Sequence, residues 1–163
     1  MPYPGGPNLQ ALAEQGDETA YDLPRAFKGE AHLDFSFSGL KTAVVNFVHR
    51  MEQKGERFRR EDIAASFQRA AVNTLVHNTF EAARREGLKK VVFAGGVSAN
   101  RELRKRALEH QGYEIYLPKL EYCTDNAAMI ASAAYFKLMT SCQAAPLSLN
   151  ADPSLELISH REA

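Results

Sequence analysis

Between residues 89 and 117 the sequence changes from a strand pattern to a helical pattern and back again. Residues 89–94 form a short apolar run typical of a buried strand, and residues 113–117 alternate between polar and apolar. Gly95 and Gly96 make the turn into the helix, and Pro118 ends the second strand. Strands joined through a helix in this way lie parallel, with a right-handed crossover. The sequence therefore predicts an α/β fold, with two strands that are too few for an independent sheet.

Helical periodicity predicts the remaining elements. We expect helices over residues 7–16, 38–54, 62–87 and 98–112, and a last one from Thr124 or Asp125 to about residue 138. Ser38 and Asp62 are the expected N-caps of the second and third helices. The third is apolar on both sides, which is typical of a central helix. Residues 17–37 are expected to form a loop with at most one short strand, residues 1–143 one lobe, and residues 144–163 an irregular tail.

Composition excludes several classes of protein. Hydrophobic residues make up 45% of the chain and charged residues 25%, as in ordinary globular proteins. No apolar stretch approaches the roughly 20 residues that cross a bilayer, so we expect no membrane partner. Two cysteines are too few for a disulfide framework, which favours a reduced, cytosolic setting. The net charge of +0 leaves nucleic-acid binding to local basic runs, at residues 57–60, 84–85 and 101–106.

The turn at Gly95 and Gly96 is the first candidate binding site. Glycines let a ligand approach the backbone, and the start of a helix offers free N–H groups to a phosphate. The crevice beyond the carboxyl end of a strand is also the usual ligand site in parallel sheets. However, residues 94–101 match neither GxGxxG nor GxxxxGK[ST]. By spacing alone, a plain tight turn explains them equally well.

Other candidates are weaker. Asp125 could be a metal ligand or a general base, although a simple helix cap is the favoured interpretation of its spacing. Residues 34–42 and 3–7 place serines or glycines before helices, where capping and turn formation are the simpler explanations. The five histidines include no pair at i, i+4, and no CxxC occurs, so the chain alone cannot assemble an ordinary zinc site. Cys123 has no evident base nearby and is not favoured as a nucleophile.

Four motifs taken together are more specific than any one of them. They are YPGGP at residues 3–7, DFSFSGLKT at 34–42, GGVSANR at 95–101 and CTDNAAMIA at 123–131. In this order and spacing they closely resemble the TsaD family, also called Gcp. The resemblance covers nearly the whole chain up to about residue 140.

The resemblance implies an actin/Hsp70/sugar-kinase-like fold of two ribonuclease H-like lobes. This chain would be one helix-rich lobe, incomplete without the N-terminal lobe. It implies transfer of threonylcarbamoyl from threonylcarbamoyl-AMP to N6 of adenosine 37 in transfer RNAs (tRNAs) that read codons beginning with A. The partners would be the other proteins of that cytoplasmic complex, including an inactive paralogue. By the same match, Gly6 and Asn100 contact the nucleotide-like substrate, Gly95 and Gly96 lie along its phosphate, and Asp125 is one of three ligands of an iron or zinc ion.

The chain departs from the family in one large respect. The family's two metal-binding histidines and its Ser-Gly-Gly-His phosphate segment lie upstream of the first motif. We therefore expect a truncated form that keeps one of three metal ligands, binds no metal tightly and catalyses nothing alone. Two other hypotheses remain: a non-catalytic, partner-binding module of the same complex, and a metal-dependent glycoprotease, a label this family has carried. No protease metal motif or nucleophile–base pair supports the latter.

Overall fold

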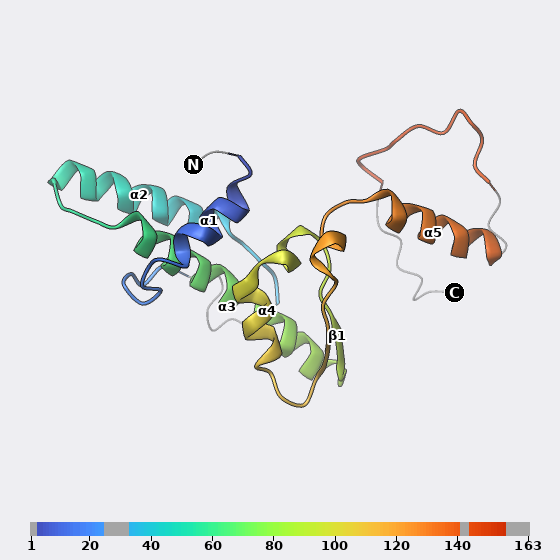
Figure 1. Cartoon of the computed structure of the whole chain (residues 1–163), viewed down its shortest axis with the longest axis horizontal. Coiled ribbons are helices and arrows are strands. Elements are labelled where there is room, and N and C mark those ends of the chain that lie inside the picture. The colour runs from blue at the N-terminus through green and yellow to red at the C-terminus, as the bar shows by residue number, and fades with distance from the viewer. Residues whose placement is uncertain (1–2, 25–32, 141–143, 156–163) are drawn as a thin grey trace. The chain divides into compact units, whose positions relative to one another are not determined.

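The computed structural model describes residues 3–24, 33–140 and 144–155 (Figure 1). The chain divides into two compact units, Met1–Asp125 and Asn126–Ala163. The second contains α5 (Ala127–Met139). The elements of the first unit are α1 (Gly5–Ala13), α2 (Ser38–Lys54), α3 (Arg60–Arg85), β1 (Lys90–Val92), the 3-10 helix η1 (Gly96–Ala99), α4 (Arg101–Leu108), β2 (Glu114–Tyr116) and the 3-10 helix η2 (Leu120–Tyr122).

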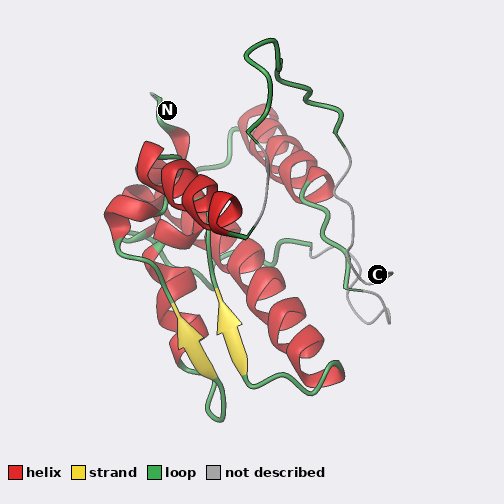
Figure 2. Cartoon of the chain, turned by 90° about the vertical axis from the view of Figure 1, so that its right-hand side faces the viewer, coloured by secondary structure: helices red, strands yellow, loops and turns green. Residues whose placement is uncertain are grey.

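The predicted parallel pair of strands is confirmed. β1 and β2 lie side by side in one direction, with Val91 opposite Ile115 (Figure 2). One face of the pair packs on the helices, since Val91 is buried in the main core. The other face is bare: Val92 is 71% exposed. The prediction that residues 89–94 form a buried strand was therefore wrong for Val92, because no side chain among the described residues covers it.

The long helix α3 is central to the first unit, as its two apolar sides predicted. One part of it packs on β1 and α4 in the main core of Val72, Val76, Phe80, Ala83, Val91, Leu103 and Ala107. Its N-terminal turns contact α1 through Ala64 and Ala65, and its middle contacts α2 through Ala70. Each large apolar side chain buried in this way contributes about 1.5–3 kcal/mol. The strand pair is thus held from one side by helices that the sequence places before and between the strands.

Two predicted helix caps were wrong. Ser38 is the first residue of α2 instead of its N-cap, which is Phe37. Asp62 lies within the first turn of α3, after the N-cap Arg59. Its carboxylate oxygen accepts a hydrogen bond from the Asp17 N–H at 2.9 Å. Asp62 therefore ties the loop after α1 to α3, a tertiary role that competes with capping.

The last helix also begins later than predicted. Neither Thr124 nor Asp125 starts α5, since Asn126 is its N-cap, and the Asn126 side chain accepts a bond from the Met129 N–H at 3.0 Å. Asn126 has the extended backbone that a cap requires (φ −150°, ψ 151°). No residue of α5 is buried within the structure as described. Residues 144–155, which lie within the expected tail of residues 144–163, contain no helix or strand.

Gly16 sets the approach of α1 to α3. A Cβ atom at Gly16 would lie 2.1 Å from the Glu61 carbonyl oxygen and 2.7 Å from the Asp62 nitrogen. Both are backbone atoms of α3, so neither can rotate away. Any side chain at this position would therefore move α1 from its seat on Ala64 and Ala65.

The region between α1 and α2 was predicted to be an ordered loop with at most one short strand. Residues 17–24 and 33–37 contain no helix or strand. Residues 25–32 lie outside the described residues, so part of that prediction does too. Across the described chain, none of the helices has both the length and the apolar character that a membrane span requires.

Candidate functional site

The glycine turn lies directly after β1. Gly95 has φ 82°, a left-handed conformation that favours glycine. Its carbonyl oxygen accepts bonds from the Ser98 N–H at 2.9 Å and the Ser98 hydroxyl at 2.7 Å. Gly95 and Gly96 are both exposed, and a Cβ added at either would meet nothing within 4 Å. The left-handed backbone conformation explains why glycine is found at position 95. At position 96, neither the backbone conformation nor close neighbouring atoms require a glycine.

Asn100 fixes the start of α4. Its side-chain oxygen accepts a bond from the Leu103 N–H at 2.9 Å, and its side-chain nitrogen donates to Gln68 of α3 at 2.9 Å. The predicted helix start at Ser98 was wrong, because η1 occupies residues 96–99 and Asn100 has the extended backbone of a cap. Asn100 is partly exposed and held in place by both bonds.

The first helix, α1, also contacts the start of α4. The Gln10 side-chain oxygen accepts a bond from the Arg101 N–H at 2.9 Å, and the Glu14 carboxylate lies 3.2 Å from the Arg101 guanidinium. Gly6, near the start of α1, lies one helical turn before Gln10 and is exposed. The structure therefore brings the helix that carries Gly6 against the start of α4, next to Asn100.

The loop after β2 leaves the same edge of the strand pair, because β1 and β2 are parallel. It runs through η2 to Cys123, which is only 2% exposed. The side chain of Arg104 on α4 donates hydrogen bonds to the carbonyl oxygens of Ser98 and Pro118. Asp125, two residues after Cys123, is exposed. The predicted carboxylate and the glycine turn are thus carried by loops that one arginine side chain joins.

The residues present do not make a complete metal centre. Across the described residues, no three His, Cys, Asp or Glu side chains gather where they could hold an ion. Asp125 remains a single candidate ligand, and one carboxylate does not fit the usual three or four protein ligands of a transition metal.

Sequence reasoning did not single out three side chains that shape this site, Gln10, Gln68 and Arg104. It assigned Arg104 to a basic run on a solvated helix face. A signal was available, because residues 103 and 107 are both apolar at helical spacing, which places position 104 at the edge of a buried face. Gln10 and Gln68 carry no such local signal, since their partners lie on other elements.

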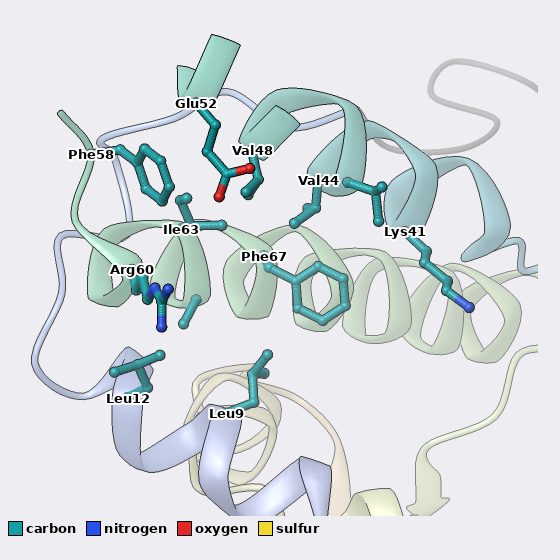
Figure 3. A pocket seen from close by; sticks show the side chains of 12 residues that line it. Leu9, Leu12, Lys41, Val44, Val48, Glu52, Phe58, Arg60, Ile63 and Phe67 are labelled. Carbon is teal, nitrogen blue, oxygen red and sulfur yellow. The ribbon is translucent and has the colours of Figure 1, made fainter. Parts of the chain in front are cut away.

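A pocket lies between α1, α2 and α3 (Figure 3). It encloses about 360 Å³, and its walls are mostly apolar, with Leu9, Val48 and Phe67 among them. The charged side chains that line it are Lys41, Glu52 and Arg60. Lys41 belongs to the weaker candidate at residues 34–42, and the pocket is not lined by Gly6, Gly95, Gly96, Asn100 or Asp125. Its apolar walls suit a hydrophobic ligand better than a nucleotide.

Parallel strands followed by a glycine turn and a carboxylate-bearing loop are typical of α/β proteins, a class in which the usual ligand site is the carboxyl edge of the sheet. Comparison with known proteins is more specific. Residues 1–132 match the family model for TsaD, tRNA N6-adenosine threonylcarbamoyltransferase. The chain belongs to the TsaD family.

Curated relatives agree over almost the whole chain. A tRNA N6-adenosine threonylcarbamoyltransferase of Caldicellulosiruptor saccharolyticus is 50% identical over 98% of this chain and 48% of its own length. Those of Moorella thermoacetica and Bacillus subtilis are 48% and 44% identical, over 96% and 99% of this chain and 46% and 47% of their own lengths. The chain thus spans about half the length of the curated relatives it matches.

Proposed function

We propose that this chain forms the C-terminal, actin-like lobe of a tRNA N6-adenosine threonylcarbamoyltransferase. In that role it binds the phosphate and nucleoside of threonylcarbamoyl-AMP and helps to place the threonylcarbamoyl group beside N6 of adenosine 37. Its partners are a tRNA, the N-terminal lobe and the other proteins of the complex, and it works in the cytoplasm, where tRNA is found. The chain alone is inactive.

One observation carries this proposal. The glycine turn after β1 and the loop that leads to Asp125 leave the same edge of the parallel strands and are bonded to the same helix, α4. In threonylcarbamoyl-AMP the reacting carbonyl carbon is bonded to the phosphate through one oxygen, so this substrate needs a group that binds the phosphate and a group that acts at the adjacent carbonyl, held a fixed distance apart. The match of residues 1–132 to the TsaD family supports the choice of this substrate.

Each predicted residue has a physical task in this proposal. The open face at Gly95 and Gly96 lets the phosphate approach backbone N–H groups. Asn100, held by Gln68, presents its amide to the nucleoside from a fixed position. Gly6 has no side chain, so it leaves room for the nucleoside beside the start of α1. Asp125 offers a carboxylate at the reacting end. The amine of adenine is a weak nucleophile, so correct placement of both reactants supplies much of the rate.

Complementation in trans tests this proposal. The chain would be co-expressed with the N-terminal half of a full-length relative, such as the one from Bacillus subtilis. The partner proteins, threonine, bicarbonate, ATP and unmodified tRNA would be added, and modified adenosine would be measured by mass spectrometry. We expect modification by the complex and none by either half alone. Asp125→Ala should abolish it, with a loss of at least about 100-fold, as expected for a group at the reacting centre.

Asp152→Ala is the matched control. Asp152 lies beyond the residues that match the family model, so this variant should modify tRNA at the normal rate. A folded complex of the two halves that modifies nothing would contradict the proposed function and favour a non-catalytic, partner-binding module.

Metal binding provides a separate test. With Asp125 as its single candidate ligand, the isolated chain should bind Fe²⁺ or Zn²⁺ only weakly, and calorimetric titration should show no saturable 1:1 site. Tight 1:1 binding that Asp125→Ala removes would contradict the prediction that this chain holds an incomplete site.

A further inference from the structure

Arg104 is the one side chain that bonds to both loops of the candidate site among the described residues. Its Nε donates to the Ser98 carbonyl oxygen at 2.7 Å, in the loop after β1. Its Nη2 donates to the Pro118 carbonyl oxygen and lies 3.4 Å from the Cys123 sulfur, in the loop after β2. A planar guanidinium offers several donors in fixed directions, so these bonds set the spacing between the loops.

On the first side the link continues to the glycine turn. Ser98 is only 2% exposed, and its hydroxyl and N–H both donate to the Gly95 carbonyl oxygen. Arg104 holds the carbonyl of this same serine. A shift of the guanidinium would therefore be passed through Ser98 to Gly95, the residue with the left-handed backbone.

On the second side the link continues toward Asp125. The turn at η2 is closed by the Tyr122 N–H, which donates to the Lys119 carbonyl at 2.9 Å, and by the Cys123 N–H, which donates to the Leu120 carbonyl at 3.2 Å. Arg104 bonds to this turn at both ends, at Pro118 and at the buried Cys123. Asp125 follows two residues later, so the turn fixes where the segment carrying it begins.

We propose that Arg104 is a positioning residue that sets the distance between the glycine turn and the Asp125 segment. This inference rests on the proposed function, in which the turn receives the phosphate and Asp125 faces the reacting end. Arg104 itself touches no substrate in this proposal. Its role is to keep two loops, which follow different strands, in the one arrangement that fits threonylcarbamoyl-AMP.

The buried thiol of Cys123 gives a readout that does not depend on activity. In a Cys142→Ser background, the rate of modification of Cys123 by a chromogenic disulfide reagent reports opening of the loop after β2. Arg104→Met keeps most of the side-chain length and removes the donors. Because it loses two to three hydrogen bonds, we expect modification about tenfold faster, or more. Arg104→Lys, which keeps one charged donor group, should fall between wild type and Arg104→Met.

Arg50→Met is the matched control, because Arg50 is exposed on α2 and its guanidinium lies over the Phe47 ring. It should leave the rate of Cys123 modification unchanged. The rates would be measured at several low urea concentrations, since a local opening depends on urea much less than global unfolding does. Acceleration in Arg104→Met that disappears once corrected for global unfolding would contradict the proposal.

The complex with the N-terminal half gives the second readout. There, Arg104→Met should raise KM for threonylcarbamoyl-AMP about tenfold, with partial recovery in Arg104→Lys, because the turn and the Asp125 segment no longer fit the phosphate and the adjacent carbonyl at the same time. An inactive wild-type complex would refute the proposed function. An active wild-type complex in which Arg104→Met changes neither Cys123 modification nor KM would refute the role of Arg104 alone.

Discussion

Two helices that follow the two strands begin with the same cap and yet differ in everything around it. Asn100 is the N-cap of α4 and Asn126 that of α5, and each asparagine accepts a bond from the N–H three residues later. Around α4, the side chains of Gln68, Gln10 and Arg104 add bonds, and Leu103 and Ala107 are buried. In α5 no residue is buried. A good local cap therefore starts a helix without giving it a place in a core.

The same difference in surrounding contacts distinguishes the two parts of the candidate site, the glycine turn with Asn100 and the segment that carries Asp125. The glycine turn and Asn100 lie within a network of internal bonds, so their geometry exists before any ligand arrives. The Asp125 segment follows the buried Cys123 and leads into a helix whose apolar side chains, such as Ile130 and Phe136, are exposed.

The strongest test of this comparison replaces one leucine in each helix. Leu103 of α4 is 3% exposed and Leu138 of α5 is 58% exposed. Leu103→Ala should lower the free energy of unfolding by about 2–5 kcal/mol, through lost burial and a cavity in the main core. Leu138→Ala should change it by less than about 0.5 kcal/mol. Urea denaturation followed by circular dichroism measures both. Equal losses would show that α5 is buried in solution.

The two caps allow a finer test. Asn100→Ala should cost about 2 kcal/mol, because it removes both the cap and the bond to Gln68. Asn126→Ala should cost about 1 kcal/mol of local helix stability. It should therefore lower the helical signal without moving the midpoint of unfolding.

Serine variants separate the two contributions at Asn100. Asn100→Ser keeps an oxygen that can cap α4 but loses the donor to Gln68, so it should recover about half of the loss. Asn126→Ser should recover nearly all of the helical signal. If both serine variants behave like the alanine variants, the caps do not contribute as described.

The smallest expected effect is on the stability of the fold at low pH. Hydrogen bonds from Arg84, and then from Arg85, lower the pKa of Glu81 to about 2 at the end of α3, just before β1. Because the pKa of Glu81 is lower in the folded state than its ordinary value of 4.5, its stabilisation is complete above about pH 4.5 and is lost as the pH falls toward 2. The effect is modest, since both arginine partners are exposed and solvent screens the ion pairs.

Glu81→Gln should therefore lower the melting temperature slightly at pH 6 and leave it close to that of wild type near pH 2. Melting curves recorded with one probe in the main core, near β1 and α4, and another in α5 would show which of the two regions unfolds first at low pH. If the difference in melting temperature between wild type and Glu81→Gln stays constant from pH 6 to pH 2, the ion pairs of Glu81 with Arg84 and Arg85 are not its cause.

Much of the fold was predictable because its signals are local. The helical period identified α3, the change to strand periodicity identified β1 and β2, and Gly55 with φ 66° ends α2 where expected. The errors have tertiary causes. Asp62 was mistaken for a cap because its donor, Asp17, lies 45 residues earlier. Val92 was expected to be buried, but burial of a strand depends on neighbours that a local pattern does not specify.

The candidate site was predictable in the same uneven way. Gly95 could be found because a turn after a strand requires unusual backbone, and Asp125 because it lies within a recognisable motif. The spacing of residues 103 and 107 places Arg104 at the edge of a buried face but does not predict that it links two loops, since arginine on a short helix is most often solvated. Its partners, Ser98 and Pro118, are backbone carbonyls, which leave no trace in the amino-acid sequence.

Gly16 has a consequence for how evolution would treat this chain. Its neighbours in α3 are backbone atoms, which are the same for every residue type, so no compensating substitution at positions 61 or 62 could make room for a side chain. A library containing every residue type at position 16 should return almost only glycine among folded clones. Such invariance would record helix packing and no chemistry, and a search for binding residues by conservation would be misled by it.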